Sequence, residues 1–239
     1  MPGRLKFLWN SISMKSRIIL TIIFILCGSV FCHAEVVQKE TDGFVYYLYV
    51  PSSYESARQY PLIVALHWST GRGTDMIERW KEPAEKYGYI VACPNSKEIN
   101  YWDTDEDRDV LRMISDIRKD YSIDSNVFVT GFSGGAMFTY HLGVNYPDVF
   151  KAMAPFAGSL KRLLGDSINL NYASQPIPVL IVHGTNDNVV DISESYFAKE
   201  ELEKYGYKVK LREIGGLNHE YQYNISWPII QWFEKIKNG

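Results

Sequence analysis

The sequence has 239 residues, of which 46% are hydrophobic and 22% charged, and its formal net charge is −3 at pH 7. This composition is that of an ordinary globular chain with enough apolar residues for a sizeable core, and the length suits one α/β domain. The acidic balance argues against nucleic acid or an anionic membrane surface as a partner.

The first 34 residues predict a secretory signal. An apolar run from Ile18 to Cys27 precedes Cys32-His33-Ala34, which offers small residues for cleavage after Ala34. Before the run stand four basic residues, Arg4, Lys6, Lys15 and Arg17. This order of segments is typical of exported proteins. The alternative is an uncleaved anchor helix, but the run is short for spanning a bilayer. We therefore expect a secreted or periplasmic protein without a stable membrane anchor.

Cleavage after Ala34 leaves 21 basic and 28 acidic residues, a net charge of about −7 on the same counting. Two of the three cysteines leave with the signal, so Cys93 remains alone and no intrachain disulfide can form. Export without disulfides fits a bacterial protein with an adequate core. Cys93 ends the apolar run 90–93, where a thiol usually acts as a small buried hydrophobe.

Strands and helices are expected to alternate along residues 35–239, which we assign to a single catalytic domain. Apolar and β-branched runs predict strands at 44–50, 61–66, 89–92, 126–130, 152–157, 179–182 and 208–214. The first of them is typical of an edge or near-edge strand. Apolar residues at helical spacing predict helices at 74–87, 107–121, 136–142, 193–205 and 227–237. This alternation predicts an α/β fold with a doubly wound, mainly parallel sheet. The about twenty residues between 157 and 179 are too few for a large cap domain.

The pentapeptide Gly131-Phe132-Ser133-Gly134-Gly135 lies between a predicted strand and a predicted helix. This is the setting of a G-x-S-x-G nucleophile elbow, in which the serine occupies a strained turn. Side chains at Gly131 or Gly135 would collide with the adjoining strand or helix. Because two glycines and a serine at this spacing also occur by chance, the motif needs partners.

Two such partners follow Ser133, each at the end of its own strand. Asp187 comes after the strand at 179–182, and His219 comes after the strand at 208–214. A serine hydroxyl is a weak nucleophile unless an imidazole removes its proton, and a carboxylate fixes the tautomer of that imidazole. Carboxyl ends of parallel strands meet at one edge of a sheet. The order Ser133, Asp187, His219 therefore predicts a catalytic triad.

Other residues fit these roles less well. His67 and His183 each begin a turn directly after a strand, where a histidine usually bonds loop backbone, and His141 lies within a predicted helix. Asp191 is the alternative acid, but its position suits the cap of the helix that starts near residue 193. Five carboxylates could suggest a metal site, yet acidic residues are favoured at a helix N-terminus; they are Asp103, Asp105, Glu106, Asp107 and Asp109. We expect no metal or organic cofactor.

Acyl transfer also requires donors for the oxyanion. The backbone N–H of Gly134 is one candidate, because it lies at the start of a helix. The second should come from the loop after residue 66, with Ser69 favoured and Trp68 as the alternative. Aromatic residues in strand-end loops could line a substrate cleft, although ordinary packing explains them equally well; they are Trp68, Tyr101, Trp102 and Tyr221.

From about residue 61 to the end, the chain resembles secreted esterases and polyhydroxybutyrate-depolymerase-like members of the α/β-hydrolases. It is also similar to small carboxylesterases and dienelactone hydrolases. The matching stretches are Leu66-His67, Tyr121–Asp124, Gly131–Gly135, His183–Asp187 and Asn218–Glu220. The resemblance implies an α/β-hydrolase fold and an esterase that acts on small or polymeric esters through an acyl-enzyme.

The family usually has glycine after the first histidine, where this chain has Trp68. Either the loop runs differently, or the indole forms part of the acyl pocket. The function has alternatives as well: the stretch 218–221 also resembles the histidine loop of prolyl-oligopeptidase-like peptidases, and a non-catalytic binding protein could use the same scaffold. Feruloyl, acetyl-sugar, hydroxyalkanoate and lipid esters all require the same triad.

Overall fold

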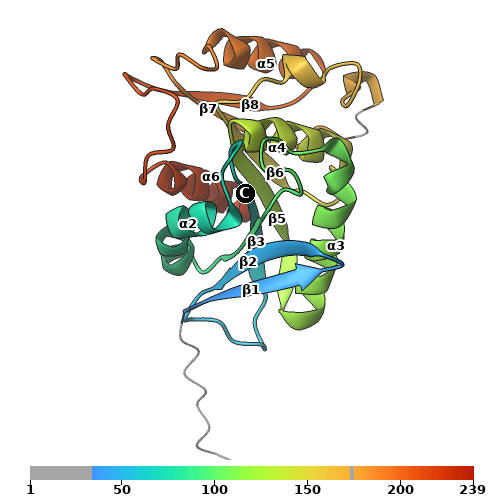
Figure 1. Ribbon diagram of the computed structural model, residues 1–239, viewed down its shortest axis with the longest axis vertical. Coiled ribbons are helices and arrows are strands. Elements are labelled where there is room, and N and C mark those ends of the chain that lie inside the picture. Colours follow the sequence, from blue (N-terminus) through green and yellow to red (C-terminus); the bar gives the residue numbers. More distant parts are fainter. Residues whose placement is uncertain (1–33, 173–174) are drawn as a thin grey trace, which may run out of the picture. The chain divides into compact units, whose positions relative to one another are not determined.

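Eight strands form one sheet in the order β1-β2-β4-β3-β5-β6-β7-β8 (Figure 1). The computed structural model describes residues 34–172 and 175–239, so the predicted signal lies outside the described residues except for Ala34. The pairs β1–β2 and β2–β4 are antiparallel, and every other neighbouring pair is parallel. The expectation of a doubly wound, mainly parallel sheet is confirmed.

All the predicted strands and helices are present, and one further strand precedes them. The strands are β1 (Glu35–Thr41), β2 (Phe44–Val50), β3 (Tyr60–Leu66), β4 (Ile90–Pro94), β5 (Ile123–Phe132), β6 (Ala152–Phe156), β7 (Val179–Gly184) and β8 (Val209–Ile214). The helices are α2 (Gly73–Tyr87), α3 (Asp107–Asp120), α4 (Gly134–Asn145), α5 (Ser193–Lys204) and α6 (Ser226–Asn238). Short 3₁₀ turns lie at Thr104–Glu106, Lys161–Leu163 and Leu170–Tyr172.

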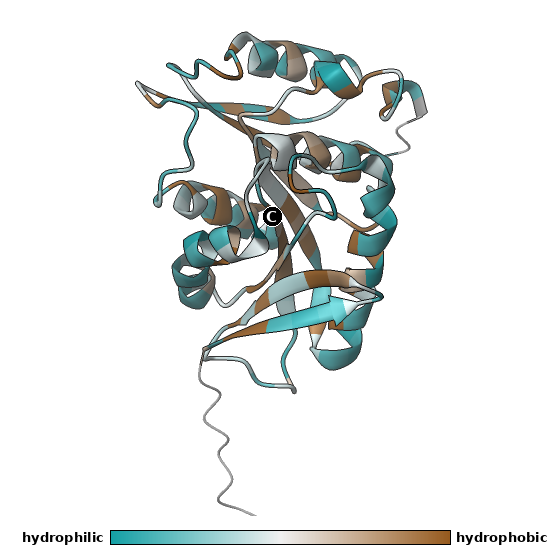
Figure 2. Cartoon of the chain, viewed as in Figure 1, coloured by the Kyte–Doolittle hydropathy of each residue, from teal (hydrophilic) through white to brown (hydrophobic). Residues whose placement is uncertain are grey.

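β1 is the strand that the sequence analysis did not predict. It pairs along its whole length with β2, from Glu35 opposite Val50 to Thr41 opposite Phe44. Its side chains are mostly hydrophilic and exposed, whereas the central strands are apolar (Figure 2). Because β1 forms the edge, β2 is the second strand, which agrees with the near-edge position expected for it.

Helices cover both faces of the sheet. α3, α4 and α5 pack on one face, and α2 and α6 pack on the other (Figure 1). All seven residues of β3 are buried, since its side chains enter both layers in turn. On the second face, the fully buried side chains of Trp80 and Phe233 anchor α2 and α6. The helices thereby fix the central strands, whose carboxyl ends support the site.

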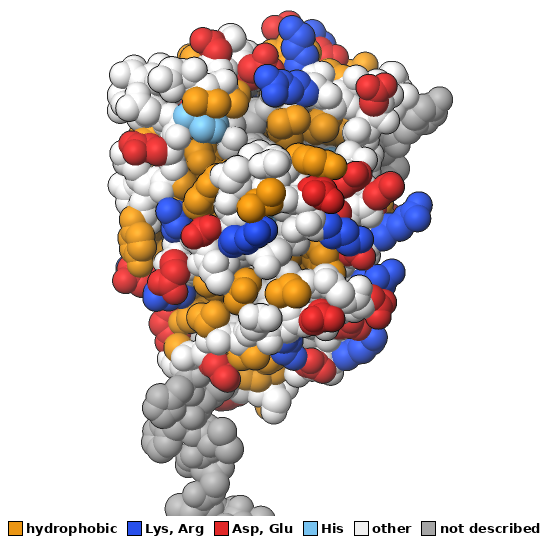
Figure 3. Space-filling view, in the orientation of Figure 1, with side chains coloured by type: hydrophobic (Ala, Val, Ile, Leu, Met, Phe, Trp, Pro, Cys, Tyr) orange, Lys and Arg blue, Asp and Glu red, His pale blue; other side chains and the backbone are white. Residues whose placement is uncertain are grey.

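The connection from β6 to β7 contains only two 3₁₀ turns among its described residues, so no helical cap stands over the sheet in this part of the chain. Within residues 34–172 and 175–239, no helix is both long and apolar enough to cross a bilayer. On the face shown in Figure 3, acidic and basic side chains of the described residues are interspersed, without a continuous basic patch.

Candidate active site

A tight turn between β5 and α4 presents Ser133. Ser133 has φ 54° and ψ −114°, a conformation that L-residues rarely adopt, and its N–H donates to the carbonyl of Phe156 at 2.9 Å. A Cβ on Gly131 would lie 2.4 Å from the carbonyl oxygen of Gly135, and a Cβ on Gly135 would lie 2.4 Å from that of Leu66. Only glycine therefore fits on both sides of the serine.

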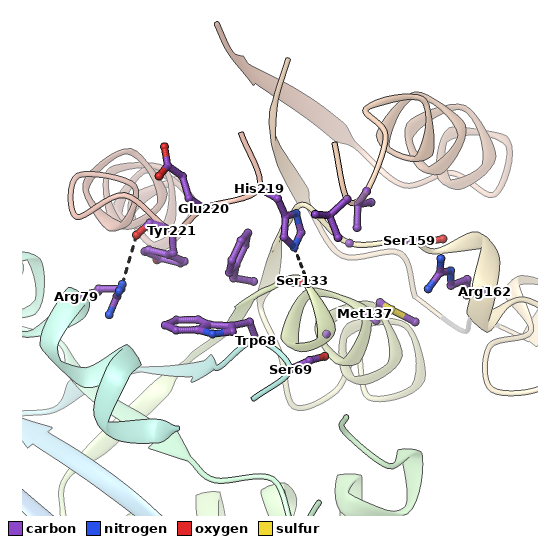
Figure 4. Close-up of a pocket in the computed structure, with 15 residues that line it drawn as sticks. Trp68, Ser69, Arg79, Ser133, Met137, Ser159, Arg162, His219, Glu220 and Tyr221 are labelled. Carbon is purple, nitrogen blue, oxygen red and sulfur yellow. Dashed lines mark hydrogen bonds between the residues drawn. The ribbon is translucent and has the colours of Figure 1, made fainter. Parts of the chain in front are cut away.

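The structure brings Ser133, His219 and Asp187 into one hydrogen-bonded row. Figure 4 shows the contact between His219 and Ser133. Nε2 of His219 lies 2.9 Å from Oγ of Ser133, and Nδ1 lies 2.7 Å from Oδ2 of Asp187. The three residues come from the ends of β5, β8 and β7 respectively. An unprotonated Nε2 can accept the serine proton while Nδ1–H donates to the carboxylate, which is the arrangement a serine nucleophile requires.

Asp187 is held ionised although its side chain is fully buried. Burial raises the pKa of a carboxyl group, but here the hydrogen bond with His219 and two backbone N–H groups outweigh it and lower the pKa. Those N–H groups belong to Val190 and Val189 and donate to Oδ1 at 2.9 Å each. The carboxylate therefore keeps its charge in a dry position, where it can stabilise an imidazolium.

The alternative residues take structural roles. Asp191 accepts the N–H of Ser193 at 2.8 Å at the start of α5. His67 bonds the carbonyl of Trp68 through Nδ1 and accepts the N–H of Ser96 through Nε2, and burial lowers its pKa. His141 lies 3.2 Å from Asp107. In each case the side chain supports a turn or a helix.

The acidic cluster before α3 is also used within the fold. Glu106 accepts the N–H groups of Lys97 and Asp103, and Asp109 forms ion pairs with Lys97 and Arg112. Within the described residues, no group of three His, Cys, Asp or Glu is arranged to hold a metal ion.

In Figure 4, Ser69 in the loop after β3 and His219 lie on opposite sides of Ser133. A Cβ on Gly134 would lie 2.7 Å from Oγ and 3.3 Å from N of Ser69, so the two backbones meet here. Among the described residues, neither the N–H of Ser69 nor that of Gly134 has a hydrogen-bond acceptor. Both N–H groups therefore lie free beside Ser133. Gly134 meets Ser69 rather than Trp68, which favours Ser69 as the candidate for the second donor.

The conformation of this loop explains how Trp68 replaces the glycine of related loops. The N–H of Gly71 donates to the carbonyl of Trp68 at 2.9 Å, which closes a turn, and the positive φ of 68° falls on Thr70 rather than on Trp68. The indole packs against Gly71 and lines the pocket. Trp68 therefore avoids a backbone conformation that requires glycine, and its indole forms part of the pocket wall.

A pocket of about 590 Å³ opens over Ser133. Two of the four aromatic residues proposed to contact substrate, Trp68 and Tyr221, line it. Tyr101 is exposed and Trp102 is buried, and the structure brings neither of them to the pocket. Trp102 instead donates from Nε1 to the carbonyl of His67 at 2.8 Å and stacks on Phe138. Ordinary packing, rather than contact with substrate, therefore explains the position of Trp102.

Several pocket residues were missed by the sequence analysis; they are Arg79, Phe132, Met137, Gly158, Ser159, Arg162, Val189, Val190 and Glu220. Gly158 and Ser159 follow β6 directly, so the strand-end rule could have found them. Arg79 lies in the middle of α2, where it resembles any solvent-facing arginine. No local signal marks it, because its position depends on how α2 packs beside the loops that carry Trp68 and Tyr221.

The sequence matches known families and proteins. The family model described as phospholipase/carboxylesterase matches residues 104–235, more than half of the chain. The chain is 30% identical over 167 residues to a bifunctional acetylxylan esterase/xylanase of Neocallimastix patriciarum, which covers 66% of this chain and 23% of that protein. It is 33% identical over 127 residues to feruloyl esterase B of Talaromyces stipitatus, with 47% of this chain and 35% of that protein covered. The matches thus span less than half of either relative.

Solved structures share the fold. An acetyl xylan esterase from Aspergillus awamori superposes with a TM-score of 0.71 at 20% identity, covering 84% of this chain and 99% of that one. A ferulic acid esterase from Anaeromyces mucronatus, solved in complex with ferulic acid, gives a TM-score of 0.70 at 18% identity, with 87% and 95% covered. At these identities the likeness concerns the eight-stranded architecture.

Proposed function

Because the chain belongs to the phospholipase/carboxylesterase family of α/β-hydrolases, we propose that it is an exported serine esterase. The proposed enzyme hydrolyses carboxylic esters through an acyl-enzyme intermediate. The observation that carries this proposal is the hydrogen-bonded row from Ser133 through His219 to Asp187. The strained backbone of Ser133 and the two free N–H groups beside it supply the other parts that acyl transfer requires.

In the proposed reaction, Oγ of Ser133 attacks the ester carbonyl while its proton passes to Nε2 of His219. The N–H groups of Gly134 and Ser69 bind the oxyanion of the tetrahedral intermediate, and Asp187 stabilises the imidazolium. The C–O bond of the ester then breaks, and the alcohol leaves with the proton from His219. Water repeats these steps on the acyl-enzyme, which releases the carboxylic acid and restores Ser133.

The substrate class follows from the relatives and from the pocket. Two relatives are named for acetylxylan and feruloyl esters, and we propose an acyl group esterified to a sugar as the substrate here. The pocket is open enough for such a group, and the indole of Trp68 and the ring of Tyr221 offer flat apolar walls to a sugar or an aryl ring.

Export is supported by the N-terminal segment, with its basic residues, apolar run and small-residue site. The cysteine content is consistent with it. Cys93 is buried in β4, and burial raises the pKa of its thiol well above the ordinary value, so it behaves as a core residue rather than as a nucleophile.

A substrate panel combined with active-site labelling tests the proposal. The panel would contain 4-nitrophenyl esters of increasing acyl length, methyl ferulate, acetylated xylo-oligosaccharides and 4-nitroanilide peptides, each assayed with Ser133→Ala as the control. We expect hydrolysis of the esters and covalent modification of Ser133 by a fluorophosphonate, located by peptide mass spectrometry. Hydrolysis of the peptides alone would indicate a peptidase, and a protein without any modification would point to a binding protein on a hydrolase scaffold.

A further inference from the structure

The pocket over Ser133 is more basic than the chain that forms it. Its ionised lining residues are Arg79 and Arg162 with a single carboxylate, Glu220, whereas acidic residues outnumber basic ones in the sequence. In Figure 4, Arg79 and Arg162 lie on opposite sides of Ser133, with Trp68 between Arg79 and the serine. Hydrolysis of a neutral ester by the proposed triad requires neither arginine.

Arg79 is held in place at the pocket wall. Its guanidinium carbon lies 5.0 Å from the ring centre of Trp68 and 5.7 Å from that of Tyr221. Nη1 donates to the carbonyl of Asp75 at 2.6 Å, and Nε makes a longer contact of 3.4 Å with the carbonyl of Tyr221. Aromatic faces stabilise the cation without using its N–H groups, so the guanidinium is oriented but not saturated.

The remaining donors of Arg79 lack an anionic partner. A guanidinium has five N–H donors, of which two are used by these carbonyl groups. Within residues 34–172 and 175–239, no carboxylate forms an ion pair with Arg79.

Three acidic residues near Arg79 in α2 or in the pocket lining have partners of their own, and Glu82, one turn further along α2, is exposed and forms no ion pair with Arg79 among the described residues. Asp75 accepts the N–H of Arg72, Glu78 pairs with Lys81, and Glu220 accepts an N–H from Gln222. Arg79 is half-buried and lines the pocket, and its guanidinium is oriented but has no carboxylate partner among the described residues, so it is suited to bind a carboxylate in a forked geometry.

We propose that Arg79 forms an anion subsite, so that the preferred substrate is an ester that carries a free carboxylate. The carboxylate can belong to the alcohol part, as in an acidic sugar, or to the acyl part, as in a dicarboxylic acid esterified at one end. It reaches Arg79 across the indole of Trp68 while the ester carbonyl lies at Ser133. This inference rests on the proposed esterase function and narrows its substrate class.

Two matched pairs of substrates separate these sources. On the alcohol side, the caffeoyl ester of quinic acid is compared with its methyl ester, which removes only the carboxylate. On the acyl side, mono-4-nitrophenyl adipate is compared with 4-nitrophenyl hexanoate. We expect wild-type kcat/KM to be higher for the anionic member of one pair, and Arg79→Gln to lower that value by roughly 10- to 100-fold, mainly through KM. The ratio of the two kcat/KM values, anionic over neutral, should fall by a similar factor, and this ratio is the quantity compared between variants.

The control variants distinguish recognition of the substrate's charge by Arg79 from mere support of the loop at residues 218–221. Arg79→Lys should keep part of the preference, because it retains the charge but loses the fork. Arg108→Gln, the same change on the exposed surface of α3, should have no effect. Equal losses of kcat/KM for both members of each pair would overturn the proposal. Arg79 would then only hold the backbone of Tyr221 in position. A preference that disappears with Arg162→Gln instead would overturn it as well, as would the absence of any preference in the wild type.

A binding measurement makes the result independent of turnover. In the Ser133→Ala background, calorimetry would give the Kd values of both anionic substrates, the caffeoyl ester of quinic acid and mono-4-nitrophenyl adipate, with Arg79 intact and with Arg79→Gln. A roughly 10-fold or greater weakening supports the subsite even if the enzyme hydrolyses no ester, in which case only the proposed function fails. Unchanged Kd values, together with normal Ser133-dependent hydrolysis of neutral esters, reject the subsite alone.

Discussion

Nε2 of His183 lies 3.4 Å from Oδ2 of Asp187, the carboxylate oxygen that also lies 2.7 Å from Nδ1 of His219. His183 is completely buried, and its Nε2 lies 2.8 Å from the carbonyl oxygen of Val190. A carbonyl only accepts, so Nε2 carries the proton, and Nδ1 accepts from the hydroxyl of Ser195 at 2.5 Å. A second imidazole thus supports the carboxylate of the proposed triad from within the core.

Ser195→Ala removes the donor that fixes this tautomer. Because Nδ1 of His183 is buried, losing its partner should lower the free energy of unfolding by about 1–3 kcal/mol. Ser56→Ala, the same change at an exposed serine between β2 and β3, is the matched control and should stay within about 0.5 kcal/mol. Urea unfolding followed by tryptophan fluorescence measures both, and equal values for the two variants would show that the buried hydroxyl has no such role.

Asp187→Asn keeps the shape of the acid but reverses the preferred tautomer of His219. In a serine triad this change lowers kcat by roughly 10⁴-fold with little effect on substrate binding. Asp191→Asn, four residues further along, should leave kcat within about twofold because Asp191 only caps α5. Comparable losses in both variants would mean that the acid has been assigned to the wrong residue.

The lowered pKa of Asp187 predicts a stability effect at acid pH. A carboxyl group whose folded pKa lies below its unfolded value of about 3.8 stabilises the protein above that pH, and the contribution is lost as the pH falls through the folded pKa. The stability advantage of wild type over Asp187→Asn should therefore shrink between about pH 6 and pH 3. Urea titrations at both pH values measure it. An advantage that grows on acidification would contradict the lowered pKa.

Gly134→Ala tests the contact between the elbow and the loop after β3. The new Cβ would press on Oγ and N of Ser69, so kcat/KM should fall by roughly 10- to 100-fold as the second donor is displaced. No gain in the free energy of unfolding is expected, because Gly134 is the first residue of α4 rather than an interior one and the overlap with Ser69 must be relieved. Gly215→Ala is the control, because nothing lies within 4 Å of its Cβ position. Unchanged esterase activity in Gly134→Ala would show that the N–H of Ser69 does not bind the oxyanion.

Much of the fold could be predicted because burial leaves a clear pattern. β3 and β7 are buried on both faces, so their sequences are continuous apolar runs. β1 escaped prediction because it is an exposed edge strand with the polar sequence EVVQKET, whose pairing depends on the neighbouring β2 rather than on its own hydrophobicity.

Some residues of the site could likewise be predicted from the sequence, and others could not. Ser133, Asp187 and His219 could be proposed because each follows a recognisable strand, and strand ends converge. The roles of Tyr101 and Trp102 depend on which way a loop turns: one is exposed, and the other packs under His67 and Phe138. Arg79 could not be found from the sequence, because a helix, a turn and the histidine loop together define its surroundings.

The hydrolysis of a short 4-nitrophenyl ester by Ser133→Ala, compared with wild type, tests the central claim most directly. Without the nucleophile, no acyl-enzyme can form, so kcat should fall by roughly 10³-fold or more while the free energy of unfolding stays close to that of wild type. A purified, folded Ser133→Ala protein that retained nearly the wild-type rate would contradict the assignment of Ser133 as the nucleophile.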